Sequence, residues 1–306
     1  MTDERSRTAA GEGGVDLDLA RALFPELAAR VDAAYGRNRT GRREGGDGVD
    51  GREDSLDAWL DREAAGLRRS GTAGAAFGEI ADDAARSRFE RAFAAARKTV
   101  ARAGLRLPEP ELFADAGVDL AALGASAAGD AALVPVPAPH GLGAEGWLSL
   151  FDRATGGEAG RDPVALLLAT EVLRGFPVLD EVHDAGVPRV RAAGAGGAAP
   201  GRATPGEEVV WTLRLVPAGD APPVAGLGFA HGPHVSLPEM LMLQLMRLEA
   251  GEDPVDAHTF TWLAGVLAEG RLAARHVYDA GERAVRISVR ETGNQGPHLG
   301  ARPPVG

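Results

Sequence analysis

The segment from Val209 to Arg290 constrains the fold most, because strand and helix patterns follow one another closely there. Every second residue between Val209 and Leu215 is large and apolar, which predicts a strand with one buried face. A capping box, Ser236–Glu239, then predicts a helix over Leu237–Ala250 that ends at Gly251. Strands and helices therefore alternate in this part of the chain.

The same region contains three further predicted elements. Ala225–Ala230 is apolar and glycine-containing, which predicts a short buried strand. Asp256 begins a predicted helix that runs to Ala268. Leu272–Tyr278 and Ala284–Arg290 form a predicted hairpin, because their apolar residues alternate around a polar turn.

The middle of the chain predicts one more strand and two helices. Ala131–Pro137 fits a strand that its own prolines end. Ala144–Arg153 predicts a helix, and the apolar segment Pro163–Arg174 predicts a helix buried on most sides. We therefore expect an α+β domain over residues 130–292.

The first part of the chain is predicted to be helical over residues 15–125. Apolar residues recur there at helical spacing in four segments, Val15–Tyr35, Leu56–Arg69, Gly78–Ala103 and Glu111–Leu123. Three stretches have too few apolar residues to join a core. They predict a disordered tail at residues 1–14, a flexible linker at residues 36–54 and a Gly/Pro-rich C-terminal tail at residues 293–306. The fold class expected is α+β, a helical N-terminal half followed by a mostly antiparallel sheet with packed helices.

Composition excludes several kinds of chemistry. The chain has no cysteine, so disulfides, thiolate metal sites and cysteine nucleophiles are excluded. Its net charge is −11, which disfavours nucleic acid as a partner. No apolar stretch reaches the roughly 18 residues of a membrane span, and Met1–Gly14 has no apolar leader segment. We expect a cytoplasmic protein without membrane contact.

Three of the seven histidines directly follow a proline, where composition predicts about half of one such pair. Because proline restricts the backbone, each of these loops could hold an imidazole in one direction. His231 adds a further histidine beside one pair, and Glu239 lies close by in the sequence. We therefore expect a pocket that contains His234 and His298, and the candidate pocket or metal-site residues are His140, His231, His234, His298 and Glu239.

A helix, a turn, a second helix and a hairpin over residues 237–290 have the order of a winged-helix DNA-binding module. The hairpin carries a candidate basic surface of Arg271, Arg275, Arg283, Arg286 and Arg290. However, the predicted second helix has no Arg or Lys, which a recognition helix needs for bases and phosphates. The simpler interpretation is a sheet kept soluble by arginines.

The sequence lacks the phosphate-binding, serine-hydrolase, zinc-protease and calcium-loop motifs. The leading hypothesis is therefore a non-enzymatic interaction or regulatory protein with an unknown protein partner or self-association, and with no cofactor. One alternative is a metal-dependent or histidine-based hydrolase that uses the Pro-His loops, with a divalent metal in the first case. The second alternative is DNA binding through residues 237–290.

Overall fold

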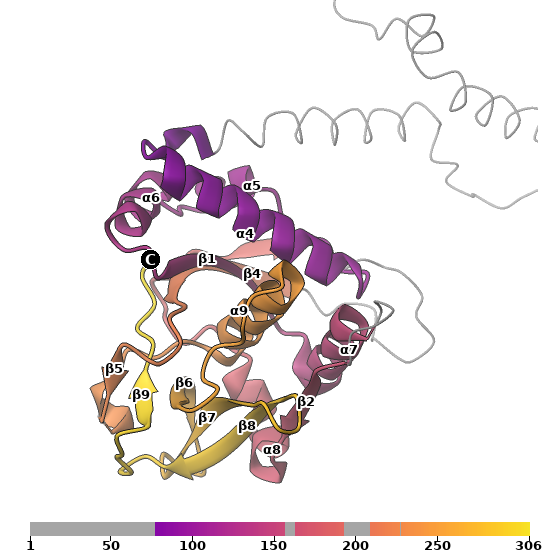
Figure 1. The fold of residues 1–306 in the computed structure, drawn as a ribbon, viewed down its shortest axis with the longest axis vertical. Helices are drawn as coiled ribbons and strands as arrows, with labels where there is room; N and C mark the ends of the chain where they lie inside the picture. The colour runs from indigo at the N-terminus through magenta and orange to yellow at the C-terminus, as the bar shows by residue number, and fades with distance from the viewer. Residues whose placement is uncertain (1–76, 157–162, 193–208, 227) are drawn as a thin grey trace, which may run out of the picture. The chain divides into compact units, whose positions relative to one another are not determined.

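A computed structural model describes residues 77–156, 163–192, 209–226 and 228–306 of the chain. The predictions for residues 1–14, 15–35, 36–54 and 56–69 lie outside these residues. Within the described part, helices come first and two β-sheets follow, which confirms the predicted α+β class (Figure 1). The helices are η1 (Phe77–Glu79), α4 (Asp83–Ala101), α5 (Pro110–Asp115), α6 (Leu120–Gly129), α7 (Gly143–Thr155), α8 (Thr170–Leu179), η2 (Phe229–His231) and α9 (Leu237–Ala250).

The smaller sheet has three antiparallel strands in the order β1-β4-β3. They are β1 (Leu133–His140), β4 (Val209–Pro217) and β3 (Val190–Ala192). The prediction that prolines end β1 is wrong, since the strand continues to His140. Pro135, Pro137 and Pro139 occupy alternate positions on a strand that pairs along one edge only. Their missing N–H groups can therefore all face the open edge, where no ladder hydrogen bond is lost.

The larger sheet has six strands in the order β2-β8-β7-β6-β9-β5. Its strands are β2 (Ala165–Leu168), β5 (Val224–Ala225), β6 (Phe260–Leu267), β7 (Leu272–Asp279), β8 (Ala284–Glu291) and β9 (Leu299–Ala301). The pairs β2–β8 and β6–β9 are parallel and the other pairs are antiparallel. Strands β7 and β8 confirm the predicted hairpin.

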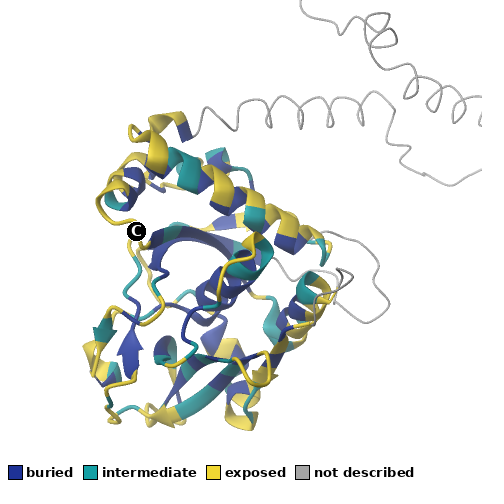
Figure 2. Cartoon of the chain, in the orientation of Figure 1, coloured by how far each residue is buried: buried dark blue, intermediate teal, exposed yellow. Residues whose placement is uncertain are grey.

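Helix α9 lies between the two sheets (Figure 1). It contacts α4, α7, β1 and β6, and every residue from Leu237 to Met246 is buried (Figure 2). The predicted capping box is confirmed. The Ser236 hydroxyl accepts from the Glu239 backbone N–H, and the Glu239 carboxylate accepts from the Ser236 backbone N–H at 2.9 Å. Gly251 ends the helix with a φ of 72°, a conformation that glycine adopts without strain.

The predicted helix over Asp256–Ala268 is wrong, because this segment contains strand β6. Its β-branched and aromatic residues, such as Thr261 and Trp262, favour a strand once β7 is available as a partner. Asp256 does not cap a helix either. It has a φ of 64° and its buried carboxylate binds Arg302 and His276. The helix-turn-helix order needed for a winged-helix module is therefore not formed.

Three other segments also differ from their predictions. Residues 163–174 contain strand β2 followed by the start of α8, because the apolar run pairs with β8. The described residues of 225–230 contain the end of β5 and the start of η2 in place of the predicted strand, since Gly226 turns the chain with a φ of 80°. The single helix predicted over Glu111–Leu123 is two helices, α5 and α6, separated at Gly117 with a φ of 102°.

The C-terminal segment 293–306 takes part in both sheets. Leu299–Ala301 forms β9 between β5 and β6, and Val305 pairs with Leu215 of β4. Arg302 is fully buried between these contacts. One hydrophobic core extends from Phe77 in η1 to Ile287 in β8, so the helices and the sheets of the described residues share it.

Candidate functional site

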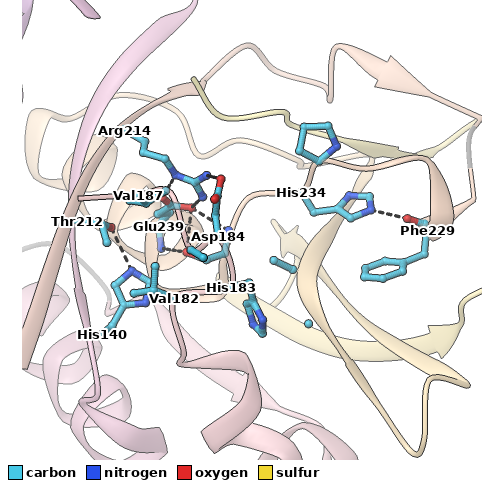
Figure 3. Close-up of a pocket in the computed structure, with 15 residues that line it drawn as sticks. His140, Val182, His183, Asp184, Val187, Thr212, Arg214, Phe229, His234 and Glu239 are labelled. Atoms are coloured by element: carbon cyan, nitrogen blue, oxygen red, sulfur yellow. Dashed lines mark hydrogen bonds and ion pairs between the residues drawn. The ribbon is translucent and has the colours of Figure 1, made fainter. Parts of the chain in front are cut away.

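A cavity of about 390 Å³ opens where four segments meet (Figure 3). These are the end of β1, the middle of β4, the loop between α8 and β3, and the start of α9, and two further segments, Phe229–His234 and the middle of β6, complete the lining. Its polar lining residues are His140, His183, Asp184, Thr212, Arg214, His234, Ser236 and Glu239. Its volume lies within the range of roughly 300–1,000 Å³ that is typical of small-ligand sites.

Three of the five candidate pocket residues, His140, His234 and Glu239, lie around this cavity. His231 and His298 are not among its lining residues, and both are exposed. His231 Nδ1 is 3.2 Å from the Gly228 carbonyl, whereas the His298 carbonyl accepts a hydrogen bond from Phe260.

His140 forms part of the cavity floor at the end of β1. Its Nδ1 lies 3.2 Å from the Asp180 carbonyl and its Nε2 lies 3.1 Å from the Thr212 hydroxyl. Because a carbonyl can only accept, Nδ1 carries the hydrogen and Nε2 accepts from Thr212. Burial lowers the pKa of His140 from 6.5 to about 4, so the ring is neutral at physiological pH.

Asp180, at the end of α8, positions both His140 and α7. Its carbonyl accepts from the His140 ring, and its carboxylate accepts from the Gly143 backbone N–H at 2.7 Å, in the first turn of α7. Burial raises the pKa of the Asp180 carboxyl from 3.8 to about 6.

The pKa values of Asp180 and His140 predict opposing effects of pH on stability. As pH falls from about 6.5 to about 4, the unfolded chain protonates its histidine first, so His140 destabilises the fold. As pH falls from about 6 to about 3.8, the folded chain protonates Asp180 first, so Asp180 stabilises the fold. Each difference in pKa corresponds to about 3 kcal/mol.

The free energy of unfolding of Asp180→Asn should therefore fall by about 3 kcal/mol more than that of the unmodified protein when the pH is lowered from about 7 to about 4. The amide keeps an acceptor for Gly143 but no longer takes up a proton. Urea denaturation across this pH range measures the difference. Asp115→Asn, at an exposed helical position, is the control and should follow the unmodified protein. Parallel pH profiles for Asp180→Asn and the control would contradict the assignment.

Arg214 and Glu239 form a buried ion pair at one wall of the cavity (Figure 3). Arg214 Nε and Nη2 donate to the two Glu239 oxygens at 2.6 and 2.7 Å. Burial favours the neutral carboxyl, but the hydrogen bonds and charge of Arg214 outweigh it and hold the Glu239 pKa below its ordinary value. The Ser236 hydroxyl also donates to Glu239, at 2.8 Å.

His234 and Phe229 form the opposite wall. Their rings stack with centroids 4.5 Å apart, and His234 Nε2 donates to the Phe229 carbonyl at 2.6 Å. Burial is the main cause that lowers the pKa of His234, so this ring is also neutral at physiological pH.

His183 lies beside a bulge in β6. The pairing of β6 with β7 shifts between Trp262 and Val266, and Gly265 there has a φ of 97°. A Cβ atom at Gly265 would lie 2.8 Å from His183 Nε2, so the glycine allows both the bulge and the approach of the ring. Burial is the main cause that lowers the pKa of His183.

A metal site is not assembled in the described part of the chain. No group of three or more His, Asp or Glu side chains there has a geometry that could hold a metal ion. His140 uses both ring nitrogens in hydrogen bonds, and Glu239 uses both oxygens to bind Arg214.

The candidate basic surface lies on and around the β7–β8 hairpin. The Arg275 guanidinium lies 4.0 Å from the centre of the Phe260 ring, and its Nε donates to Ser288 at 3.1 Å. Arg286 forms ion pairs with Asp279 and Glu282. The remaining three residues are exposed, namely Arg271, Arg283 and Arg290.

The sequence patterns did not predict Arg214, Asp184 or His183 as site residues. Arg214 could have been found, because it is a charged residue in the middle of an otherwise apolar strand. Asp184 and His183 lie in a polar loop whose sequence has no distinguishing pattern. They join the site only because the loop folds over β4.

Comparison with known proteins adds no further assignment. Among the described residues, no helix combines the length and apolar character needed to cross a membrane. No protein-family model, curated protein or solved structure significantly matches the chain.

Proposed function

We propose that this chain is a cytoplasmic, non-enzymatic regulatory protein that binds a small ligand in the cavity beside Arg214 and Glu239. The observation that carries the proposal is a cavity of about 390 Å³ whose polar floor is already hydrogen-bonded within the protein. Such a floor is rigid before a ligand arrives, which lowers the entropic cost of binding.

The side chains that resemble catalytic groups are committed to structural roles. Ser236 exchanges hydrogen bonds with Glu239, and Glu239 neutralises Arg214. His140 and Thr212 are 4% and 1% exposed, so a substrate has little access to either. These features favour binding over catalysis.

The loop over Val182–Val187 suggests how binding could be transmitted. It supplies one wall of the cavity and contains exposed residues such as Asp184 and Ala185. A ligand held against this wall favours one loop arrangement, and a partner protein can distinguish that arrangement at the surface.

A thermal-shift screen tests the proposal. Amino acids, sugars, nucleosides and carboxylic acids are each added to the unmodified protein, to Ala185→Trp and to Ala125→Trp. Ala185 is an exposed residue of the cavity wall, so a tryptophan there fills the opening. Ala125 is exposed on α6 and serves as the control.

We expect at least one compound to raise the Tm of the unmodified protein and of Ala125→Trp, but not of Ala185→Trp. A ligand present at about 100 times its Kd adds about 2.7 kcal/mol of stability, enough for a clear shift in Tm. The proposal fails if no compound acts, or if every effect persists in Ala185→Trp.

A histidine-based hydrolase is the second candidate, favoured by one specific observation. The Thr212 hydroxyl, the His140 ring and the Asp180 carbonyl are hydrogen-bonded in series, the order of a nucleophile, its base and an orienting group. A p-nitrophenyl ester assay with Thr212→Val separates the two candidates. Hydrolysis that Thr212→Val abolishes would support the hydrolase, and background rates for both proteins would support binding.

A further inference from the structure

The opening of the cavity holds two opposite charges that are only loosely paired. Arg214 Nη1 lies 3.8 Å from Asp184 Oδ2, which is longer than a hydrogen bond. The other two Arg214 nitrogens are bound to Glu239. The Arg214 side chain is 9% exposed whereas that of Asp184 is 58% exposed, so the pair consists of a fixed cation and a more accessible anion.

This arrangement discriminates among ligand charges. A simple anion that reaches Arg214 also meets the carboxylates of Asp184 and Glu239. A simple cation that reaches Asp184 offers no acceptor to the remaining nitrogen of Arg214. A ligand that carries both charges on adjacent atoms can match both groups, because its carboxylate faces Arg214 and its ammonium faces Asp184.

The remaining walls are mostly apolar. Val182, Val187, Phe229, Pro233 and Ala264 line the cavity around the charged pair. An apolar group of a ligand loses contact with water there, which favours binding.

We propose that the ligand is a free amino acid with an apolar side chain. Its carboxylate binds Arg214 Nη1, its ammonium binds Asp184, and its side chain lies against Val187 and Phe229. This inference rests on the proposed function, since it names the ligand class of the same cavity.

Isothermal titration calorimetry with leucine tests the inference. N-acetyl-leucine, which lacks the ammonium, and leucine amide, which lacks the carboxylate, are titrated in parallel. We expect leucine to bind, each derivative to bind at least about tenfold more weakly, and glycine to bind more weakly than leucine.

Asp184→Asn provides the test on the protein side. It should weaken leucine binding at least about tenfold. It should not weaken the binding of N-acetyl-leucine, because that derivative has no ammonium and its carboxylate is no longer repelled by Asp184. Asp115→Asn is the matched control and should bind leucine like the unmodified protein.

Three results would overturn the inference. Equal affinities for leucine and both derivatives would show that the charged pair is not used. In the second result, leucine does not bind, but another compound gives a Tm shift that Ala185→Trp abolishes. This result would reject an amino acid as the ligand and preserve the proposed function. If no compound gives such a shift, both proposals fail.

Discussion

Arg302→Met should lower the free energy of unfolding by about 3–5 kcal/mol. Arg302 is fully buried and donates to Asp256 at 2.6 Å, to the Pro217 carbonyl at 2.7 Å and to Thr261 at 3.2 Å. Methionine fills much of the same space but leaves the buried Asp256 carboxylate without its guanidinium partner. Urea denaturation at neutral pH measures the loss.

Two further variants test this explanation. Arg290→Met changes an exposed arginine and should stay within about 0.5 kcal/mol of the unmodified protein. Adding Asp256→Asn to Arg302→Met should recover part of the loss, because the uncompensated charge is removed. His276, whose Nδ1 is 3.0 Å from Asp256, remains in place throughout. Equal stability of Arg302→Met and Arg290→Met would contradict the prediction.

The buried Asp256 also predicts the direction of the pH effect. Burial opposes ionisation, but His276 and then Arg302 outweigh it and hold the Asp256 pKa below its ordinary value of 3.8. A lowered carboxyl pKa contributes stability above the unfolded value, and that stability is lost as the pH falls below it. Asp256 therefore contributes its full stabilisation at neutral pH.

Glu239→Leu should also lower the free energy of unfolding by about 3–5 kcal/mol. The Arg214 side chain is only 9% exposed, and the substitution leaves its buried guanidinium without the bidentate carboxylate partner. It also removes the acceptor for the Ser236 backbone N–H at the start of α9. Chemical denaturation measures the effect.

The matched control is Glu145→Leu, which changes an exposed glutamate in the first turn of α7. It should alter stability by no more than about 0.5 kcal/mol. The double variant Arg214→Met/Glu239→Leu should recover most of the loss, because it removes both charges together. If the double variant is as unstable as Glu239→Leu alone, the buried charge is not the cause.

Local signals in the sequence were enough to predict several elements. The capped helix over Leu237–Ala250, the β7–β8 hairpin and strand β4 all occur where predicted. Each depends on contacts within a few residues, namely a capping box, a short turn and an alternating pattern. The sequence also predicted the α+β class, because class follows from the order of such elements.

Segments whose structure depends on distant partners were predicted wrongly. Residues 163–174 and 256–268 contain short apolar runs that fit a helix or a strand equally well. Pairing with β8, far along the chain, makes Ala165–Leu168 a strand. Pairing with β7 across a turn and with β9 near the C-terminus makes Phe260–Leu267 a strand. No local pattern records that such partners are available.

The candidate site shows the same division. The sequence by itself proposed His140, His234 and Glu239 as pocket residues, from the Pro-His pairs and from the closeness of Glu239 to one of them, together with His231 and His298, which do not line this cavity. Only the tertiary structure decided that Arg214 neutralises Glu239 and that Asp184 lies at the cavity opening. The physical reason is that the cavity is formed by packing between α9, β4 and the loop after α8. Packing brings together residues that are far apart in the sequence and share no local pattern.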